Sequence, residues 1–291
     1  MPSGGLLALK NRIKSVKSTQ KTTKAMSMIA AAKMRKAKVK LEKNNVYLTN
    51  LEEMGHAVFK YAESPENNIL IKENSSDKKL VFLLGSDTGL CGGFNGNGPN
   101  YLRNEYGKSD IIDVALIGKR CRYYLNKYGY DIVREYPDFK DVMTIKEARI
   151  IGNELINLFL KEEYGQISVV YTHYESATRQ KVVEEQILPF KYKEKYNTKA
   201  DTLDYDVEAN SDELVSEYIM RYIEEKLINA VHHSKTSEHN ARMIAMDNAT
   251  KNAKEMADDL NVKYNQLRQG AITQEIAEIV GGAESIKKKR R

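Results

Sequence analysis

The stretch of the sequence with the residue types best suited to chemistry is rich in glycine. It runs from Gly85 to Gly98, directly after the short apolar run Lys79–Leu84 and before a helical segment. A loop in that place can hold a phosphate against a helix N-terminus. Its glycines match neither the P-loop nor the dinucleotide-binding spacing, and no lysine closes it. Three interpretations stay open: a nucleotide site, a mobile turn, and a turn shaped to contact a partner.

The other groups that could do chemistry form weaker patterns. His232 and His239 share a helix face with His233 beside them, but the metalloprotease pattern of histidines and glutamate is absent, and solvated histidines are expected. Adjacent acid pairs project to different faces, so they do not converge: Glu184-Glu185, Glu224-Glu225 and Asp258-Asp259. No nucleophile has an evident base. The sequence therefore predicts no metal, no cofactor and no catalytic residue.

Two long helical segments are predicted to position everything else. The first has small or apolar residues at alternating steps of three and four, as in a coiled-coil seam: Leu6, Leu9, Ile13, Val16, Gln20, Thr23, Ser27, Ala30, Met34, Ala37 and Leu41. A helix from Gly5 to near Glu63 would be roughly 85–90 Å long, too long for one compact domain. It needs a partner along its length.

The partner is predicted at the other end of the chain. A second seam follows the same spacing: Ala249, Ala253, Met256, Leu260, Tyr264, Leu267 and Ala271. A helix from Asp212 to near Ile279, with Ser211 as its N-cap, would run on the order of 100 Å. The two segments favour an antiparallel hairpin over separate helices of an ordinary bundle. Apolar residues around Met26 on the other faces, such as Met28 and Ile29, indicate that another protein covers the hairpin.

Between the long helices the pattern changes to short strands alternating with helices. Strands are expected at 79–84, 111–117, 130–134, 167–174 and 181–188, with helices at 95–106, 119–128 and 144–164. This rhythm is typical of an α/β domain with a largely parallel sheet. The predicted fold class is therefore a long antiparallel two-helix coiled coil with an inserted Rossmann-like α/β domain. The predicted segments are 1–64, 65–209 and 210–291.

The charge of the chain is unevenly distributed. Its 291 residues carry a net charge of +6, and charged residues make up 30 %. The first helix holds most of the excess, with twelve lysines and arginines from Lys10 to Lys43 against Glu42 alone. Such a stretch is either a solvated face or a surface for an acidic partner: nucleic acid, membrane or protein.

Other features bound the location. The two cysteines form no disulfide framework, which indicates a reducing compartment. No apolar run approaches the roughly 18 residues of a membrane span, and no targeting peptide is recognised. The chain is expected to be soluble, or peripheral to a membrane through its partners. A basic coiled-coil protein that binds nucleic acid remains the main alternative, although the first helix lacks interleaved aromatic residues. A nucleotide-using enzyme built on the insert is the second alternative.

Both terminal segments resemble a known family. The run from Ile13 to Arg35, with Thr19-Gln20-Lys21-Thr22-Thr23-Lys24-Ala25-Met26, is similar to the N-terminal helix of the gamma subunit of F-type ATP synthase. So are Ser237 to Met246 and Asn265 to Ile276 at the other end, and the loop Ser86 to Gly93 in the middle. The resemblance covers the whole chain in the right order.

The resemblance implies a non-catalytic rotor shaft. It implies a ring of three alpha and three beta subunits around the coiled coil, and an epsilon subunit and a membrane c-ring beside the α/β domain. The shaft would couple rotation of the ring to sequential changes at the catalytic beta subunits. It also implies a peripheral location on the cytoplasmic face of the bacterial inner membrane, and no nucleic-acid partner.

The resemblance further implies roles for particular residues. Met26 would lie near a beta-subunit lever, with Arg35 and Lys36 as basic contacts. Contacts to a beta-subunit loop would come from Arg268, Gln269, Thr273 and Glu275. A polar network of the shaft would include Glu238 and Arg242, and the membrane ring would face Tyr205 and Glu208. The family commonly has arginine where this chain has Thr88, which puts a charged contact from that loop in doubt.

Overall fold

The structure is a computed structural model that describes residues 3–107, 111–136, 142–192 and 211–289. It divides into two compact units. The first unit holds residues up to 29 together with residues from 243 onward, and the second holds residues 30–242. The division of the chain into segments 1–64, 65–209 and 210–291 remains a prediction.

The two predicted long helices are confirmed. Helix α1 spans Ser3–Tyr61 and helix α5 spans Ser211–Lys289. Both lack internal proline, which would remove a helical hydrogen bond. The expected N-cap, Ser211, is the first residue of α5. The fold class is confirmed as well, because the remaining elements form an α/β domain between the two helices.

In the first unit, α1 and α5 pair in an antiparallel coiled coil. Val16 of α1 packs against Ala253 and Ala257 of α5. The prediction that Met256 belongs to the seam is wrong, because its side chain is 48 % exposed while Ala257 is buried. The small Ala257 lets the two backbones approach, which the larger Met256 would prevent.

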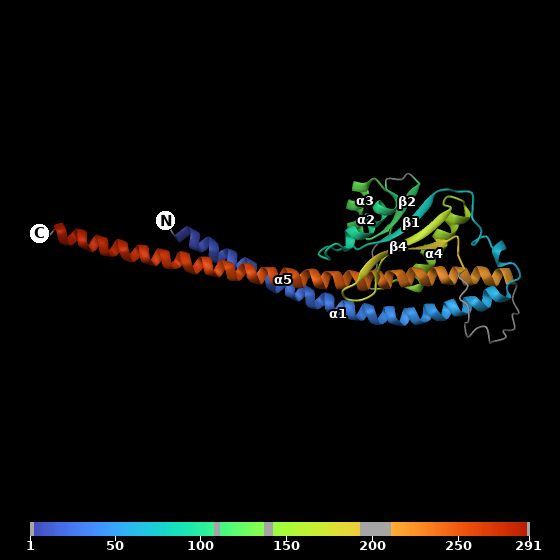
Figure 1. Ribbon diagram of the computed structural model, residues 1–291, viewed down its shortest axis with the longest axis horizontal. Helices are drawn as coiled ribbons and strands as arrows, with labels where there is room; N and C mark the ends of the chain where they lie inside the picture. Colours follow the sequence, from blue (N-terminus) through green and yellow to red (C-terminus); the bar gives the residue numbers. More distant parts are fainter. Residues whose placement is uncertain (1–2, 108–110, 137–141, 193–210, 290–291) are drawn as a thin grey trace. The chain divides into compact units, whose positions relative to one another are not determined.

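Polar pairs continue this seam. The hydroxyls of Thr23 and Thr250 lie 2.7 Å apart, and Ser27 Oγ donates to Asp247 Oδ1 at 2.6 Å. Extending this register places the start of α1 level with about residue 270 of α5. Within the first unit, α5 therefore continues past the N-terminal end of α1 (Figure 1). The predicted seam residue Leu267 is 53 % exposed, although the same register places it level with the first turns of α1.

The second unit is built on a five-stranded sheet of order β3-β2-β1-β4-β5. The strands are β1 Lys79–Leu84, β2 Ile112–Ile117, β3 Asp131–Tyr136, β4 Gln166–Tyr174 and β5 Gln180–Leu188. The first four are parallel, and β5 runs antiparallel to β4. The predicted largely parallel sheet is confirmed. Its order is that of a Rossmann half extended by two strands, with the switch point between β1 and β4.

Helices cover both faces of this sheet. The described helical elements are η1 Pro65–Asn67, α2 Phe94–Tyr106, η2 Lys119–Cys121, α3 Arg122–Tyr128 and α4 Ile145–Leu160. The single helix predicted over 119–128 is thus a 3-10 turn followed by a short α-helix. Helix α4 ends before the predicted residue 164, because Glu162 takes a left-handed conformation with φ 56°.

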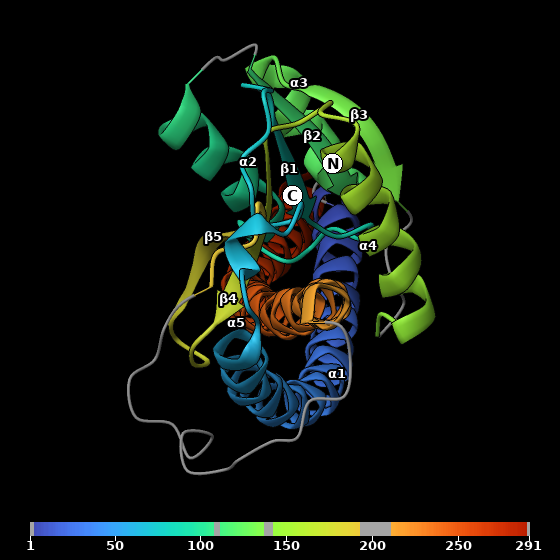
Figure 2. The same cartoon turned by 90° about the vertical axis from the view of Figure 1, so that its right-hand side faces the viewer.

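The alternating side chains of β1 build two cores. Leu80 and Phe82 face α4 and α5, while Val81 and Leu83 face α2 and α3. Figure 2 shows α4 and α5 on the opposite side of the sheet from α2. Because β1 is central and covered on both faces, its residues are apolar without alternation, as parallel strands usually are.

The C-terminal part of α1, from residue 30, pairs with the N-terminal part of α5, up to residue 242, within the second unit. A Cβ on Gly55 would lie 2.2 Å from the Tyr218 hydroxyl, so only glycine fits this close approach. Asn229 Nδ2 donates to Asn44 Oδ1 at 2.7 Å and to Asn45 Oδ1 at 2.8 Å. Such polar pairs fix the register of a coiled coil at some cost in stability.

Helix α4 begins with a capping box. Thr144 Oγ1 accepts from the Glu147 amide, and the Glu147 carboxylate accepts from the Thr144 amide at 2.7 Å. We expect Thr144→Ala to lower the free energy of unfolding by about 1 kcal/mol, because helix donors lose a partner. Urea unfolding measures this. Thr49→Ala, on the exposed face of α1, is the control and should change stability by less than about 0.5 kcal/mol. Equal effects of the two changes would contradict the assignment.

Candidate partner-binding surfaces

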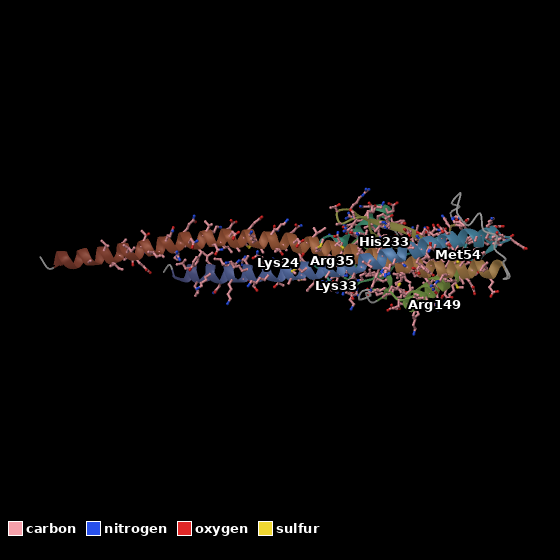
Figure 3. All side chains as sticks on the ribbon, turned by 90° about the horizontal axis from the view of Figure 1, so that it is seen from below. Lys24, Lys33, Arg35, Met54, Arg149 and His233 are labelled. Atoms are coloured by element: carbon pink, nitrogen blue, oxygen red, sulfur yellow. The ribbon has the colours of Figure 1, made fainter. Side chains whose placement is uncertain are left out.

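The basic stretch of α1 lies on the surface. Every lysine and arginine from Lys10 to Lys43 is exposed, including Arg35 and Lys36 of the predicted contacts. Figure 3 labels three of them, Lys24, Lys33 and Arg35, among the side chains of the helix. The exposed ion pair of Lys38 with Glu42, 3.6 Å apart, contributes under about 1 kcal/mol. This surface suits an acidic partner.

Apolar side chains also project from α1 in the first unit. Met28 is 65 % exposed and Ile29 is 59 % exposed, while Met26 beside them is half-buried. The neighbouring Ser27 faces α5 and is buried. Adjacent exposed apolar residues on a helix indicate a surface that another protein covers. The expectation of apolar surface beside the seam is confirmed.

The C-terminal part of α5 is exposed on most sides. The predicted contacts here are all exposed: Arg268, Gln269, Thr273 and Glu275. Thr273 Oγ1 donates to the Gln269 carbonyl at 2.9 Å, a bond within the helix. Leu267, Ile272 and Ile276 are exposed around them. The predicted contacts Tyr205 and Glu208 lie outside the described residues.

The glycine-rich loop after β1 is held tightly on its inner side. Asn95 Oδ1 accepts from the Ser86 amide and from Ser86 Oγ, both at 3.0 Å, and Asn95 Nδ2 donates to Cys91 Sγ at 3.2 Å. Ser86 Oγ also lies 2.8 Å from the Thr88 carbonyl. Burial raises the pKa of the Cys91 thiol, although the charge of Arg242 opposes this. Side-chain hydrogen bonds therefore fix the conformation of this loop.

The structure brings three predicted residues together at this loop. Arg242 Nη2 donates to Thr88 Oγ1 at 2.7 Å, and Arg242 Nε donates to the Gly89 carbonyl at 3.3 Å. Arg242 Nη1 lies 2.8 Å from Glu238 Oε1. Thr88, Glu238 and Arg242 thus form one contact between the loop and α5.

Glu238 also holds a second cation. Lys235 Nζ lies 3.0 Å from Glu238 Oε2, and both side chains are almost fully buried. Burial opposes the charge on Glu238, but Lys235 and Arg242 outweigh it and lower the pKa of the carboxyl. Lys235 and Arg242 therefore share one buried carboxylate.

The expectation of solvated histidines is wrong. His232, His233 and His239 are each only 5 % exposed, because this part of α5 is covered within the second unit. The His233 ring stacks on the His173 ring of β4 at 3.9 Å between centroids, and its Nδ1 accepts from the Tyr174 amide at 3.2 Å. Burial lowers the pKa to about 4 for His232 and His239 and to about 3 for His233.

The crevice where this fold class binds nucleotides is filled by α5. It lies at the carboxyl ends of β1 and β4, the switch point of the sheet. Ser237 Oγ donates to the Thr172 carbonyl at 3.0 Å, and Asn240 Nδ2 donates to the Ala177 carbonyl at 2.8 Å. Arg242 reaches the loop after β1 in the same way. Of the three interpretations of the glycine-rich loop, this arrangement disfavours the nucleotide site.

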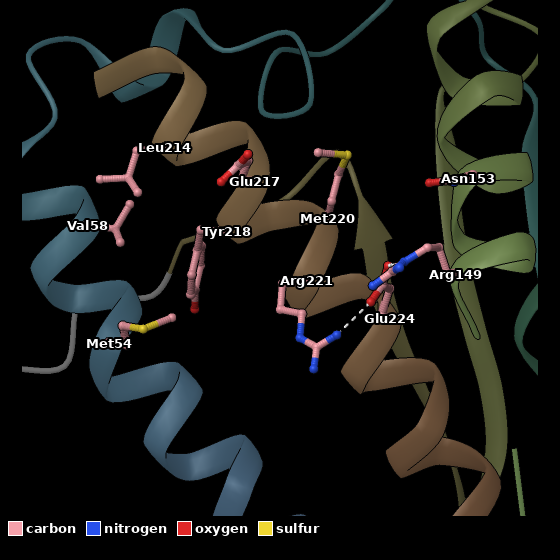
Figure 4. A pocket seen from close by; sticks show the side chains of 10 residues that line it. All are labelled: Met54, Val58, Arg149, Asn153, Leu214, Glu217, Tyr218, Met220, Arg221 and Glu224. Atoms are coloured by element: carbon pink, nitrogen blue, oxygen red, sulfur yellow. Dashed lines mark hydrogen bonds and ion pairs between the residues drawn. The ribbon is translucent and has the colours of Figure 1, made fainter. Parts of the chain in front are cut away.

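A cleft of about 570 Å³ lies between α1, α4 and α5 of the second unit (Figure 4). Its apolar wall includes Met54, Leu214 and Met220. Its polar end holds Glu224, whose carboxylate accepts from Arg149 of α4 at 2.8 Å and from Arg221 at 2.9 Å. Sequence reasoning missed this cluster, because only the three-residue step from Arg221 to Glu224 is visible in the sequence.

Lys235 was missed in the same way. It precedes Glu238 by three residues, a spacing that allows an ion pair but does not reveal burial. Among the described residues, no group of three histidine, cysteine, aspartate or glutamate side chains could hold a metal ion. No described helix is long and apolar enough to cross a membrane.

The fold and these surfaces define a class of protein: a two-helix coiled-coil subunit with an α/β insert, whose exposed basic and apolar faces suit enclosing partners. A family profile described as ATP synthase matches residues 5–286. The chain belongs to the family of ATP synthase gamma chains. The ATP synthase gamma chain of Clostridium perfringens (strain SM101) is 41 % identical over 99 % of this chain and 100 % of its own length. That of Clostridium kluyveri (strain ATCC 8527) is 43 % identical over the same shares.

Solved structures share the fold. One chain of the Euglena gracilis mitochondrial ATP synthase, in a structure of OSCP, F1 and c-ring, matches with a TM-score of 0.72 at 17 % identity. That match covers 99 % of this chain and 97 % of the other. A chain of the Tetrahymena thermophila central stalk and c-ring structure matches with a TM-score of 0.58 at 22 % identity, over 78 % and 99 %.

Proposed function

We propose that the chain is the central rotor shaft of an F-type ATP synthase, a non-catalytic subunit that couples rotation of a membrane ring to ATP synthesis. The full-length similarity to gamma chains supports this. The observation that carries it is the adjacent exposure of Met28 and Ile29 on the face of α1 that does not meet α5. Exposed apolar side chains that lie side by side favour a surface that a partner covers.

The physical mechanism follows from the lack of symmetry in a single chain. The exposed basic and apolar side chains are unevenly distributed over the two helices, so three equivalent subunits around them would each meet a different surface. A difference of about 5.5 kcal/mol in contact free energy is enough to take a two-state equilibrium from one state to the other. Turning the shaft would therefore carry each catalytic site through its states in sequence.

The proposed partners are the alpha and beta subunits in a hexameric ring, the epsilon subunit and the membrane c-ring. The named Euglena and Tetrahymena structures contain F1 or central-stalk components together with a c-ring. Both bacterial relatives support placement on the cytoplasmic face of the plasma membrane, reached through partners. The segments 1–64 and 210–291 would form the shaft and 65–209 the insert.

The proposed contacts follow the motif positions. Met26, with Arg35 and Lys36 nearby, would meet beta-subunit levers. Arg268, Gln269, Thr273 and Glu275 would meet a beta-subunit loop. Glu238 and Arg242 would belong to the polar network of the shaft, and Tyr205 and Glu208 would face the membrane ring.

The test of the proposed function is purification of the tagged full-length chain from its own cells, with mass identification of what binds. Recovery of alpha, beta and epsilon subunits with ATP hydrolysis activity is expected. Salt-sensitive recovery of RNA or DNA without those subunits would overturn the proposal and favour the nucleic-acid-binding alternative.

Met26→Lys is expected to impair coupling more than folding. It places a charge at a half-buried, packed position where an enclosing subunit would desolvate it. We expect the rate of ATP synthesis by the assembled complex to fall about tenfold, which corresponds to about 1.4 kcal/mol. Thr22→Lys, an exposed site one helical turn away, is the control and should retain the rate. A normal rate in Met26→Lys would show that this contact is not made.

Arg268→Ala is expected to lower turnover or assembly. The Arg268 side chain is exposed on α5 and can donate charge-assisted hydrogen bonds to a partner. Loss of such an anchor typically costs about 2 kcal/mol of binding, or roughly thirtyfold. Hydrolysis rate and subunit yield of the purified complex measure this, with the exposed Lys263→Ala as the control. Equal values for both variants would count against the contact.

A further inference from the structure

The loop of residues 86–93, here named the clasp loop, is held from three sides. Asn95 of α2 holds its inner face through Ser86 and Cys91. Lys119 and Arg120 of η2 hold Asp87: the Lys119 amide donates to Asp87 Oδ1 at 2.9 Å, and Arg120 Nε donates to the Asp87 carbonyl at 3.3 Å. The third side is α5. The loop is therefore braced at its two ends by the α/β domain itself.

Two side chains of other elements reach the tip of the clasp loop: Asn95 of α2, whose Nδ2 donates to the Thr88 carbonyl at 3.4 Å, and Arg242 of α5, which makes the larger number of bonds. Its Nε donates to the Gly89 carbonyl, and its Nη2 donates to Thr88 Oγ1 at 2.7 Å and lies 3.4 Å from the Thr88 carbonyl. Its Nη1 faces Glu238 Oε1 at 2.8 Å. Every nitrogen of the guanidinium thus has a partner within this chain, and the side chain is 12 % exposed.

The tip itself is conformationally demanding. Leu90 adopts φ 62°, a left-handed conformation that non-glycine residues rarely take, and its side chain is 61 % exposed. Such strain persists only where surrounding contacts hold it, and it clusters at functional clamps and switches. The bonds from Arg242 end one residue before Leu90. Together with the bond from Asn95 to Cys91 on the other side of Leu90, they hold this conformation.

Resting on the proposed rotor function, we propose that Arg242 is a positioning residue: it fastens the tip of the clasp loop to α5 and acts on coupling through that loop, not by touching a partner subunit itself. Thr88 is the matching half of this latch. With a hydroxyl at position 88, the arginine can donate to the loop without meeting a second positive charge.

The rate at which the Cys91 thiol is alkylated can report whether the contact between Arg242 and the clasp loop is intact. Its thiol is buried under the clasp loop, 3.8 Å from the Thr88 carbonyl, while Cys121 is buried in the core at η2. Alkylation of each thiol by iodoacetamide can be timed by mass spectrometry on the folded full-length chain. We expect Arg242→Lys and Thr88→Val each to speed modification of Cys91 about tenfold, as loss of a charge-assisted hydrogen bond worth about 1.4 kcal/mol predicts. Cys121 should stay slow in both.

A change in the pKa of the Cys91 thiol cannot explain faster modification of Cys91 in Arg242→Lys. Arg242 opposes the burial that raises the pKa of Cys91, so weakening its charge contact would reduce the reactive thiolate and slow the reaction. Faster modification therefore reports opening of the loop. Thr178→Val, an exposed threonine in the β4–β5 turn, is the matched control and should leave both rates unchanged. Unchanged Cys91 rates in Arg242→Lys and Thr88→Val would overturn the proposal.

The second arm measures ATP synthesis in assembled complexes. If Arg242 acts only through the clasp loop, Thr88→Val and Arg242→Lys should lower the rate to a similar degree, and the double variant should be no worse than the worse single variant. A large loss of the synthesis rate in Arg242→Lys without faster modification of Cys91 would show that Arg242 does not act through the clasp loop, and would overturn the proposal. The alkylation arm uses the isolated chain, so failure of the proposed rotor function is seen separately, as failure of the wild-type chain to support ATP synthesis.

Discussion

Glu238→Ala is expected to lower the free energy of unfolding by about 3–5 kcal/mol, because it removes the buried carboxylate that Lys235 and Arg242 share. Lys235 and Arg242 lie 3.0 Å and 2.8 Å from the two carboxylate oxygens, and the three side chains are 12 % exposed or less. The carboxyl has a lowered pKa, so its contribution is full above about pH 4.5 and is lost as the pH falls through the folded value. Urea unfolding at pH 7 measures the loss.

Two further variants separate this cause from a general loss of contacts. Lys235→Met removes one cation and leaves Glu238 paired with Arg242, so its effect should be clearly smaller than that of Glu238→Ala. Glu42→Ala removes the same charge from an exposed pair with Lys38, and should cost under about 1 kcal/mol. If Lys235→Met were as harmful as Glu238→Ala, charge imbalance would not be the reason.

This cluster shows where sequence reasoning stops. The spacing of Lys235, Glu238 and Arg242 is visible as steps of three and four, which allow ion pairs along a helix. The same spacing on α1, at Lys38 and Glu42, gives an exposed pair. Whether a pair is buried depends on what packs over it, and β4 and the clasp loop come from distant parts of the chain.

The long helices could be predicted because their pattern is local. Uninterrupted three-and-four spacing without proline extends over many turns, and the buried residues Ile13, Val16, Ala30, Ala37 and Leu41 follow it. The strands were predictable for the same reason, since continuous apolar runs such as Leu80–Leu84 belong to covered parallel strands. The sequence did not reveal that Ala257, and not Met256, lies in the seam. Hydrophobicity favoured methionine, but the close approach of the two backbones required the smaller residue.

The histidines of α5 show a second feature that could not be predicted from the sequence, the burial of polar residues. A polar run from His232 to Asn240 is typical of a solvated face, yet every residue in it is buried. Its partners are carbonyls and rings of β4 and the following turn, such as Thr172, His173 and Ala177. Buried polar groups are tolerated where tertiary contacts give them hydrogen bonds, and among the described buried side-chain atoms Asn240 Oδ1 is the exception.

Acidification is expected to destabilise the second unit steeply through these histidines. In the folded chain the pKa is about 4 for His232 and His239 and about 3 for His233, while an unfolded histidine titrates near 6.5. The unfolded state therefore binds more protons below about pH 6.5. Stability from these groups is complete above that pH and is lost as the pH falls toward the folded values. Between pH 7 and pH 5 the loss should reach about 5 kcal/mol for the three together.

Urea unfolding across this range gives the number of protons taken up, and one variant assigns them. His233→Asn keeps an acceptor where Nδ1 receives the Tyr174 amide, and it removes the titrating ring. The pH slope of stability should fall from about three protons to about two, because one buried neutral group no longer resists protonation. A wild-type slope below one proton would show that the rings are solvated when folded. An unchanged slope in the variant would show that His233 is not among the groups that open on acidification.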